Sequence, residues 1–410
     1  MKIVLATGIY PPDIGGPATY VRELAKELVA RGVEVVVVTY AGVRCQVSGV
    51  SDDGWNVVGV RRLGGPLLRW WRYARALKKY AADADVVLAF SLVSAGVPLW
   101  LCRRFWPLDC LPVRQAGARG KPKCVLRLGG DFLWERYTDC GGMLGLREWY
   151  ESRFWQIVGS LARWLAGSLL QTFDHVVFST RFQEEIYEKH YRGLPEHLVI
   201  ENALSAPTPG PSPAAAGEGR TKHAPFRLLF MGRFVAFKNL PSLLRAMTEL
   251  PGITLTLVGE GPLRHLLEGN VLGLHLRDRV TFHPKATPDE RNEYFHSHDL
   301  LVIPSVTEIS PNVALEARAA GLPVLLTEET GLSERLRQGM VVRKLRTPEH
   351  IRDAIREVVA TYEHVVQEAA RAPTNRPWGK VREEYFRLFS SLINPHPDPL
   401  PSKGESGSLL

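Results

Sequence analysis

Two glutamates stand eight positions apart on a segment whose surroundings favour an anionic ligand. Glu308 follows residues 300–303, a short apolar run that is typical of a buried parallel strand. Residues 311–320 show helical spacing, and Glu316 lies about one turn inside that helix. Free N–H groups at a helix start favour a phosphate, and carboxylates accept hydrogen bonds from paired sugar hydroxyls. The spacing predicts that the two acids hold a nucleotide-sugar, one at its sugar end and the other at its ribose end.

A second loop carries two cations directly after a predicted strand. Residues 226–231 form an apolar run, and Gly232, Arg233 and Lys238 follow it. A planar guanidinium and a compact ammonium on one loop suit a diphosphate. We expect this loop to bind the phosphates of the same ligand.

Two glycine turns follow other predicted strands. Gly15 and Gly16 come after residues 2–6 and shortly before a helical stretch, so the backbone there can approach a ligand closely. Gly259 follows residues 253–258 and begins the turn Gly-Glu-Gly-Pro. Either turn, taken alone, also fits an ordinary tight turn with no ligand.

Asp131 is an acid on a further loop that follows a predicted strand. It follows residues 123–128, another strand-like run, and the pair Gly129 and Gly130. Its carboxylate either faces the ligand as a polar catalytic group or caps the helix that follows. The residues alone leave both alternatives open.

Strand-like and helix-like segments alternate through both halves of the chain. This order predicts an α/β fold class with two Rossmann-like parallel-sheet domains that face a cleft. A single long helix is expected over residues 147–170. The expected domains are residues 1–205, a Pro/Gly/Ala-rich linker at 206–224, residues 225–375, a helix at 376–393 packing back toward the first domain, and a disordered tail at 394–410.

Charge and cysteine content restrict the class of protein. The net charge is +8, yet residues 61–127 hold 14 Lys and Arg against 3 Asp and Glu, which favours an anionic partner. No nucleic-acid-binding motif accompanies this charge, so nucleic acid is not an expected partner. Five cysteines without a C-x-x-C pair, no long apolar run and no signal-peptide pattern predict a cytoplasmic protein, at most on the inner face of the plasma membrane.

Together these segments resemble glycosyltransferase family 4, whose members have the GT-B fold. The segment from Glu308 to Glu316 is similar to the E-x7-E motif of its retaining enzymes. The loop from Gly232 to Lys238 resembles the family's G-R-x4-K-G element, and the turn at Gly259 resembles its V-G-x-G-P turn. The similarity extends over nearly the full chain, apart from the linker, the tail and a surface insertion at 107–122.

The resemblance implies an acceptor-side first domain and a nucleotide-sugar-binding second domain. It implies that Glu308 contacts the transferred sugar, Glu316 the donor ribose, and Arg233 and Lys238 the diphosphate. The expected catalytic residues are Glu308, Asp131, Lys238 and Arg233, and the expected donor-binding residues are Gly15, Gly16, Gly232, Arg233, Lys238, Gly259, Ser310, Asn312, Val313 and Glu316.

Three positions depart from the family pattern. Asn239 stands where glycine is usual. The family's Phe-x-Gly is Phe282-His283-Pro284 here, so its last position also lacks the usual glycine. Family members often carry a histidine after a central strand of the first domain, and the corresponding stretch here, residues 127–135, has none. The departures concern the recognition of the donor base and the polar group that faces the reacting sugar.

The expected function is a retaining glycosyltransferase of the hexosyltransferase type. It would move a sugar from a nucleotide-diphosphate-sugar to a glycan or lipid-linked acceptor, in cell-envelope or exopolysaccharide synthesis. No cofactor or metal is expected, because no Asp-x-Asp pair ends a strand and the cations offset the leaving diphosphate. The alternatives are a non-catalytic GT-B scaffold subunit of a glycan-assembly complex, kept open by the missing histidine, and a sugar-nucleotide epimerase.

One basic segment points toward a membrane. Residues 66–80 combine Arg, Lys, Trp and Leu on a helix-compatible stretch, which suits peripheral docking on an anionic membrane. The alternative is a helix that packs its tryptophans on the sheet and turns its arginines outward.

Overall fold

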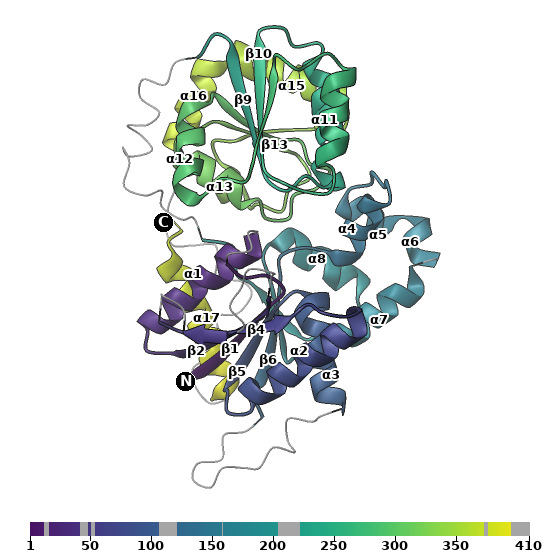
Figure 1. Ribbon diagram of the computed structural model, residues 1–410, viewed down its shortest axis with the longest axis vertical. Helices are drawn as coiled ribbons and strands as arrows, with labels where there is room; N and C mark the ends of the chain where they lie inside the picture. The colour runs from purple at the N-terminus through teal and green to yellow at the C-terminus, as the bar shows by residue number, and fades with distance from the viewer. Residues whose placement is uncertain are drawn as a thin grey trace.

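The computed structural model describes residues 1–11, 16–41, 48–50, 54–105, 121–157, 159–203, 222–372 and 376–394. Two twisted sheets, each with helices on both faces, stack along the longest axis of the molecule (Figure 1). Most of the expected linker, most of the expected insertion at 107–122 and nearly all of the expected tail lie outside the described residues.

The N-terminal sheet has the order β3-β4-β2-β1-β5-β6-β7-β8. Strand β3 runs antiparallel to β4, and every other neighbouring pair is parallel. Continuous apolar runs form these strands because both faces of a parallel sheet are covered. The strands are β1 (Lys2–Thr7), β2 (Glu34–Ala41), β3 (Ser48–Val50), β4 (Asn56–Arg61), β5 (Val86–Phe90), β6 (Lys123–Leu128), β7 (His175–Phe178) and β8 (Glu196–Val199).

Helices cover both faces of this sheet. One face carries α1 and, from the far end of the chain, α17, which pack on residues such as Ile3 and Leu5. The other face carries α2, α3, α7 and α8, which pack on the alternate residues Val4 and Ala6. The helices of this half are α1 (Gly16–Ala30), α2 (Pro66–Ala81), the short π-helix η1 (Leu92–Gly96), α3 (Val97–Phe105), α4 (Phe132–Asp139), α5 (Leu146–Glu151), α6 (Arg153–Ile157), α7 (Ser160–Leu170), α8 (Arg181–His190) and α17 (Trp378–Ile393).

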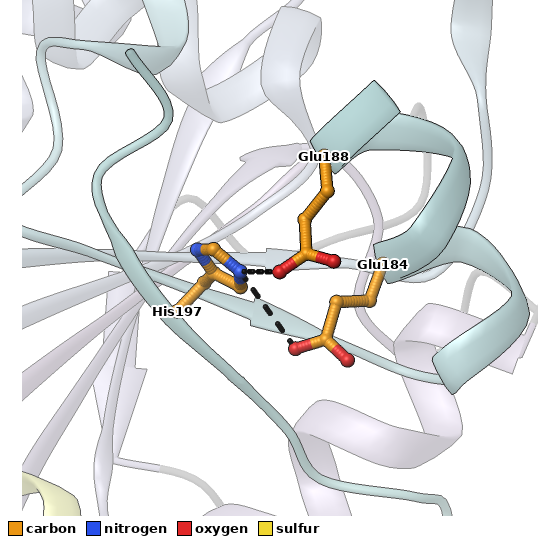
Figure 2. Close-up of side chains that lie close together, drawn as sticks. All are labelled: Glu184, Glu188 and His197. Carbon is orange, nitrogen blue, oxygen red and sulfur yellow. Dashed lines mark hydrogen bonds and ion pairs between the residues drawn. The ribbon is translucent and has the colours of Figure 1, made fainter. Parts of the chain in front are cut away.

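Helix α8 is fastened to the edge strand β8 by charged side chains. Figure 2 shows Glu184 and Glu188 of α8 with both carboxylates at the same end of the His197 ring. His197 Nε2 lies 2.9 Å from Glu188 Oε1 and 3.8 Å from Glu184 Oε1, and His197 Nδ1 lies 2.8 Å from the Pro195 carbonyl oxygen. These contacts hold α8 on the edge of the sheet.

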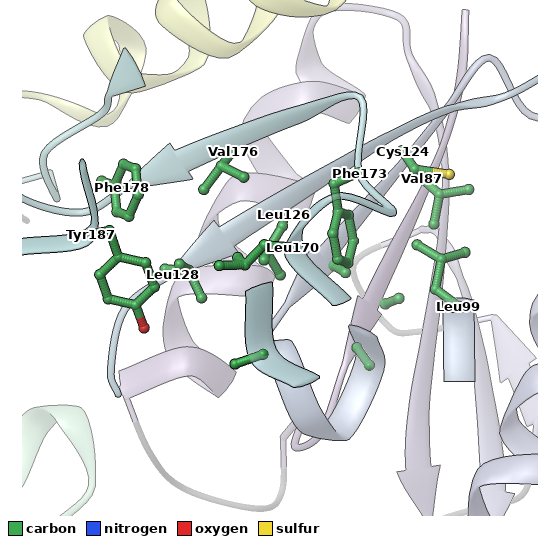
Figure 3. Close-up of a cluster of buried hydrophobic side chains, with 14 of the residues drawn as sticks. Val87, Leu99, Cys124, Leu126, Leu128, Leu170, Phe173, Val176, Phe178 and Tyr187 are labelled. Carbon is green, nitrogen blue, oxygen red and sulfur yellow. The ribbon is translucent and has the colours of Figure 1, made fainter. Parts of the chain in front are cut away.

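The core beneath α7 and α8 is aromatic and aliphatic. Figure 3 shows Leu126, Leu128 and Val176 of the strands in one layer with Leu170 and Phe173 from α7 and its end. These side chains are at most 4% exposed. The packed layer gives the loops at the ends of β6 and β7 a rigid base.

The expected long helix over 147–170 is wrong in one respect, because the structure divides it into α5, α6 and α7. Ser152 adopts an extended backbone, and its hydroxyl accepts a hydrogen bond from the Trp155 N–H at 3.2 Å. At Gly159 a Cβ would lie 2.1 Å from the Trp155 ring. The extended backbone and side-chain bonding at Ser152 thus interrupt a helical pattern that periodicity alone shows as continuous.

The C-terminal sheet is parallel throughout and has the order β11-β10-β9-β12-β13-β14. Its strands are β9 (Phe226–Met231), β10 (Ile253–Val258), β11 (Val280–His283), β12 (Leu300–Ile303), β13 (Val324–Thr327) and β14 (Val341–Arg343). Its helices are the 3-10 turn η3 (Ala236–Lys238), α10 (Leu240–Met247), α11 (Arg264–Gly273), α12 (Pro288–Ser297), α13 (Asn312–Ala319), α14 (Glu334–Arg337), α15 (Pro348–Ala360) and α16 (Tyr362–Arg371).

Candidate active site

The loops that carry the predicted chemistry meet at one edge of the C-terminal sheet. Strands β9, β10, β12 and β13 are parallel neighbours, so their carboxyl ends lie together. Ligands of open α/β sheets bind at this edge. The loops at Gly232, Gly259 and Glu308 are therefore brought together, as the sequence predicts for a single ligand.

Glu308 is held rigidly on the loop after β12. Its backbone N–H donates to the Glu329 carbonyl at 2.9 Å, and its carbonyl accepts from the Gly331 N–H at 2.7 Å. Its carboxylate accepts from the Ser305 hydroxyl at 2.6 Å and pairs with the Lys238 ammonium. The side chain is 7% exposed, so the carboxylate has a fixed direction with few free rotamers.

The pair of Lys238 and Glu308 joins the two central loops of the site. Lys238 ends η3, and its ammonium also lies 5.0 Å from the centre of the Phe237 ring. An ammonium and a carboxylate in contact neutralise each other before a ligand arrives. The contact puts a cation of a type that suits phosphate and an anion of a type that accepts hydrogen bonds from hydroxyls at the same point.

The turn after β10 supports the loop that carries Arg233. The Phe234 N–H donates to the Glu260 carbonyl at 3.0 Å, and the Gly232 N–H donates to the Val258 carbonyl at 3.0 Å. Gly259 has φ 145°, and a Cβ on it would lie 1.9 Å from the Gly232 carbonyl oxygen. Glycine is therefore needed here because the two loops pack closely. This agrees with the alternative in which Gly259 serves a tight turn and not a ligand.

Asn239 shows why the family's usual glycine is replaceable. Its backbone is left-handed, with φ 55° and ψ 30°. Asparagine tolerates this region better than other residues with a Cβ. Its buried amide also donates to the carbonyls of Leu345 and Arg346 at 3.1 and 3.2 Å.

The start of α13 faces the N-terminal half. The Asn202 amide donates to Ser310 Oγ at 2.8 Å and to Asn312 Oδ1 at 2.6 Å. A Cβ on Gly16, the first residue of α1, would lie 3.8 Å from Asn312 Nδ2. Two helix N-termini thus approach each other, and their free N–H groups favour a negative group between them. Val313, in the first turn of α13, is half-buried, and Gly15 lies outside the described residues.

Glu316 lies on α13 with a partner that sequence reasoning did not identify. Its Oε2 pairs with the Arg291 guanidinium of α12 at 2.7 Å. Burial raises the pKa of Glu316, and Arg291 counteracts the rise. A narrow cavity beside it is lined by Thr19, Tyr20, Asn202, Ala203 and Trp378 from the N-terminal half and by Asn312, Leu315 and Glu316 from α13.

Asp131 adopts the helix-cap arrangement. It is the N-cap of α4, and its Oδ1 accepts from the Trp134 N–H at 2.9 Å. Its Oδ2 accepts from the hydroxyls of Tyr150 and Tyr187 at 2.7 and 2.9 Å, and the residue is 2% exposed. Burial raises the pKa of Asp131, while these three donors oppose the rise. Both oxygens of the carboxylate thus already accept hydrogen bonds from donors of the N-terminal half.

Glu135 is a candidate that sequence reasoning missed. It lies one turn after Asp131 on α4, and its Oε1 would lie 2.8 Å from a Cβ on Gly130. Burial and the neighbouring Asp131 raise the pKa of Glu135 to about 7, against the opposing charges of Arg233 and Lys238. The sequence does carry one signal for this residue: Glu135 lies four positions after Asp131, which places both acids on the same side of a helix that begins beside two glycines.

Aromatic packing holds helix α4, which carries Glu135, against the loop that contains Arg233 and Lys238. The rings of Trp134 and Phe237 lie 5.4 Å apart, so α4 of one half contacts η3 of the other. The Leu146 N–H donates across the same boundary to Thr307 Oγ1 at 2.9 Å. The acid, the two cations and Glu308 are therefore parts of one site built from both halves.

A larger cavity, of about 600 Å³, lies beside this site. It is lined by Leu144, Arg147, Glu148, Glu151 and Ser152 of the N-terminal half and by Glu329 and Arg346 of the C-terminal half. Arg346 pairs with both Glu148 and Glu329, at 2.6 and 3.0 Å. The cavity shares the Glu329 segment with the Glu308 loop, but it contains none of the predicted donor residues.

Known proteins match the chain over both halves. Residues 15–203 match the glycosyl transferase 4-like domain, and residues 225–361 match glycosyl transferases group 1. The D-inositol 3-phosphate glycosyltransferase of Mycobacteroides abscessus is 33% identical over 373 residues, which cover 85% of this chain and 77% of that protein.

Solved structures have the same architecture. WaaG, a glycosyltransferase involved in lipopolysaccharide biosynthesis, superposes with a TM-score of 0.66 and 18% identity over 95% of this chain and 99% of that one. Anabaena HepE in complex with UDP-glucose superposes with a TM-score of 0.68 and 16% identity over 95% and 100%. The expected GT-B fold is confirmed. The chain belongs to the group 1 glycosyltransferases, the family 4 enzymes that take a sugar from a nucleotide-sugar donor.

Proposed function

We propose that the protein is a retaining hexosyltransferase that builds a cell-envelope or exopolysaccharide glycan on a glycan or lipid-linked acceptor. The observation that carries this proposal is the contact of Lys238 with Glu308 at the carboxyl edge of the C-terminal sheet. The likeness to WaaG supports an envelope glycan, since that protein is described as acting in lipopolysaccharide biosynthesis.

The donor lies along the edge from the phosphate loop to α13. Arg233 and Lys238 bind the diphosphate, Glu308 accepts hydrogen bonds from hydroxyls of the transferred sugar, and Glu316 accepts from the ribose. The same path is lined by Gly16, Gly232, Gly259, Ser310, Asn312 and Val313, and Gly15 directly precedes Gly16 in the sequence. The bound complex of HepE makes UDP-glucose the first donor to test.

Transfer needs stabilisation of the leaving diphosphate more than it needs a protein base. The bond from the anomeric carbon to the phosphate oxygen breaks, and the acceptor oxygen attacks that carbon from the same face. The acceptor proton passes to the leaving phosphate, while Arg233, Lys238 and the start of α13 offset its negative charge. Fixed cations that are already in place cost no reorganisation during the reaction.

Calorimetric titration with UDP, GDP, ADP, dTDP and CDP tests the donor site. We expect one diphosphate to bind, and the Arg233→Ala/Lys238→Ala variant to lose that binding. Lys222→Ala is the matched control, because Lys222 of the same half donates to the Val359 carbonyl at 3.3 Å and is not part of the proposed donor site. Transfer from the matching nucleotide-sugar then tests retention by the anomeric configuration of the product. Equal binding of every diphosphate by the double variant would contradict the proposed donor site.

A further inference from the structure

One face of the N-terminal half is both apolar and basic. Helices α2, α3, α6 and α7 together contain nine Lys and Arg and no Asp or Glu. They also carry eight of the thirteen large hydrophobic side chains that are exposed among the described residues, namely Leu67, Leu68, Trp71, Phe105, Ile157, Leu161, Trp164 and Leu165. We call this set of helices the basic apolar face.

Helix α7 shows the feature most clearly. Leu161, Trp164 and Leu165 are 65, 65 and 55% exposed, and they lie on one side of the helix by their spacing of three and four. Ala166 and Leu170 are buried on the other side. The core is therefore complete without the three exposed side chains, and their exposure calls for another partner.

Helix α2 repeats the arrangement. Its buried side is made of Tyr73, Ala74, Leu77 and Ala81, while Leu67 is 77% and Trp71 40% exposed. The Arg75 guanidinium lies 4.8 Å from the centre of the Trp71 ring, so cation and aromatic face outward together. The alternative in which this tryptophan packs on the sheet does not hold for Trp71.

The helices form one continuous side of the molecule. Helix α3 packs against α2, and Arg103 of α3 donates to the Thr172 carbonyl just beyond α7. Figure 1 shows α2, α3 and α7 on the same side of the N-terminal sheet. On the opposite face, α1 and α17 mix acidic with basic residues, and neither has a large exposed hydrophobic side chain.

We propose that the basic apolar face docks on an anionic lipid bilayer, with Leu161, Trp164, Leu165, Leu67 and Trp71 inserted among the headgroups. Protruding leucines and tryptophans with lysine and arginine among them match the chemistry of an anionic membrane surface. The complete lack of acidic residues on four helices favours anionic lipid over a protein surface of mixed charge. Among the described residues no helix is long and apolar enough to cross a membrane, so the contact is peripheral. This inference extends the lipid-linked acceptor of the proposed function.

Vesicle flotation tests the proposal. The purified protein is mixed with vesicles of phosphatidylcholine alone or of equal parts phosphatidylcholine and phosphatidylglycerol. We expect binding to the anionic vesicles only, and a loss of about tenfold or more in partitioning for Leu161→Ser/Trp164→Ser/Leu165→Ser, because each exposed side chain contributes apolar area. Arg75→Glu/Lys79→Glu should weaken binding to the anionic vesicles and reduce its salt dependence.

The control is Leu266→Ser/Leu272→Ser on α11, whose leucines are 53 and 47% exposed on the other half. It should float like the wild type. Equal flotation of the α7 variant, or no flotation of the wild type, would overturn the proposal. So would a concentration-dependent dimer, seen by ultracentrifugation, that the α7 variant loses. Calorimetric diphosphate binding on the same samples keeps the two proposals apart, because the α7 variant should bind like the wild type.

Discussion

The Asn202 amide donates a hydrogen bond of 2.6 Å to Asn312 Oδ1, and it joins the end of the N-terminal sheet to the first residue of α13. The Asn202 oxygen accepts in turn from the buried guanidinium of Arg127, which also donates to the Tyr385 hydroxyl at 2.9 Å. A polar chain thus runs from α17 through β6 to the proposed phosphate-binding helix start. These hydrogen bonds connect α13 to the N-terminal half.

Asn202→Ala should weaken diphosphate binding roughly tenfold, because it frees the start of α13 and leaves Arg127 without one acceptor. Calorimetry measures the affinity, and urea unfolding measures the accompanying loss of stability. Asn270→Ala, on α11 in the other half, is the control and should change neither. Unaltered binding by Asn202→Ala would show that the chain serves stability alone.

Glu308→Gln and Lys238→Ala should separate sugar recognition from phosphate binding. Each should lower turnover by about 10²- to 10³-fold, because each removes a preorganised charge at the reacting bond. Glu308→Gln should still bind the free nucleoside diphosphate, whereas Lys238→Ala should lose it. Steady-state transfer and calorimetry with the same protein samples check both statements. Loss of diphosphate binding in Glu308→Gln, with the fold intact by circular dichroism, would argue against this division of roles.

Gly259→Ala should lower both stability and diphosphate affinity, although Gly259 lies on a neighbouring loop and not on the loop of Arg233. The new Cβ would meet the Gly232 carbonyl oxygen at 1.9 Å, and φ 145° is a strained conformation for alanine. We expect a loss of about 2–4 kcal/mol in stability and a large fall in diphosphate affinity, because the loop of Arg233 must move. Thermal unfolding and calorimetry measure the two effects. Gly269→Ala on α11, where no atom lies within 4 Å of the added Cβ, should be tolerated.

The alternation of apolar strands and helices was sufficient to predict the two parallel sheets. Apolar runs such as residues 300–303 and 226–231 predict strands by themselves, because a strand that is buried on both faces must be apolar throughout. The loops after these strands then meet at one edge as a consequence of parallel order, so Glu308 and Lys238 could be predicted together. Their direct contact could not, since it depends on how η3 turns the side chain.

The contacts between the two halves could not be predicted from local sequence patterns. Periodicity does not reveal that Trp134 packs on Phe237 or that Asn202 reaches Asn312. Asp131 accepts hydrogen bonds from tyrosines 19 and 56 residues away, a tertiary arrangement that spacing cannot show.

Asp131→Ala tests whether this acid is structural or catalytic. Losing the cap and two buried tyrosine bonds should cost about 2–4 kcal/mol of stability in urea unfolding. Asp131→Asn keeps an oxygen for the Trp134 N–H and should retain most of the turnover. A stable Asp131→Asn protein with no turnover would instead support the catalytic alternative. Asp139→Ala, whose partner is the exposed Arg136 on the same helix, should leave stability nearly unchanged.

Glu135→Gln should remove a pH dependence near neutrality. Because the folded pKa is about 7, above the ordinary value of 4.5, the wild type holds this proton more tightly when folded. Its stability should therefore fall as the pH rises from 4.5 to about 7 and then level off, whereas the Gln variant should lack this fall. The ionised carboxylate also opposes an anion at Arg233 and Lys238, so wild-type diphosphate affinity should drop by about three- to tenfold between pH 6 and 8.

Calorimetry across this pH range compares the wild type, Glu135→Gln and Asp139→Asn, the last being an exposed acid on the same helix. The Gln variant should bind with nearly constant affinity, and Asp139→Asn should follow the wild-type curve. Parallel curves for the wild type and Glu135→Gln would mean that the nucleotide's own phosphate ionisation sets the pH dependence. A flat curve for the Gln variant alone would place the Glu135 carboxyl group within electrostatic reach of the bound diphosphate, on the side of the site built by the N-terminal half.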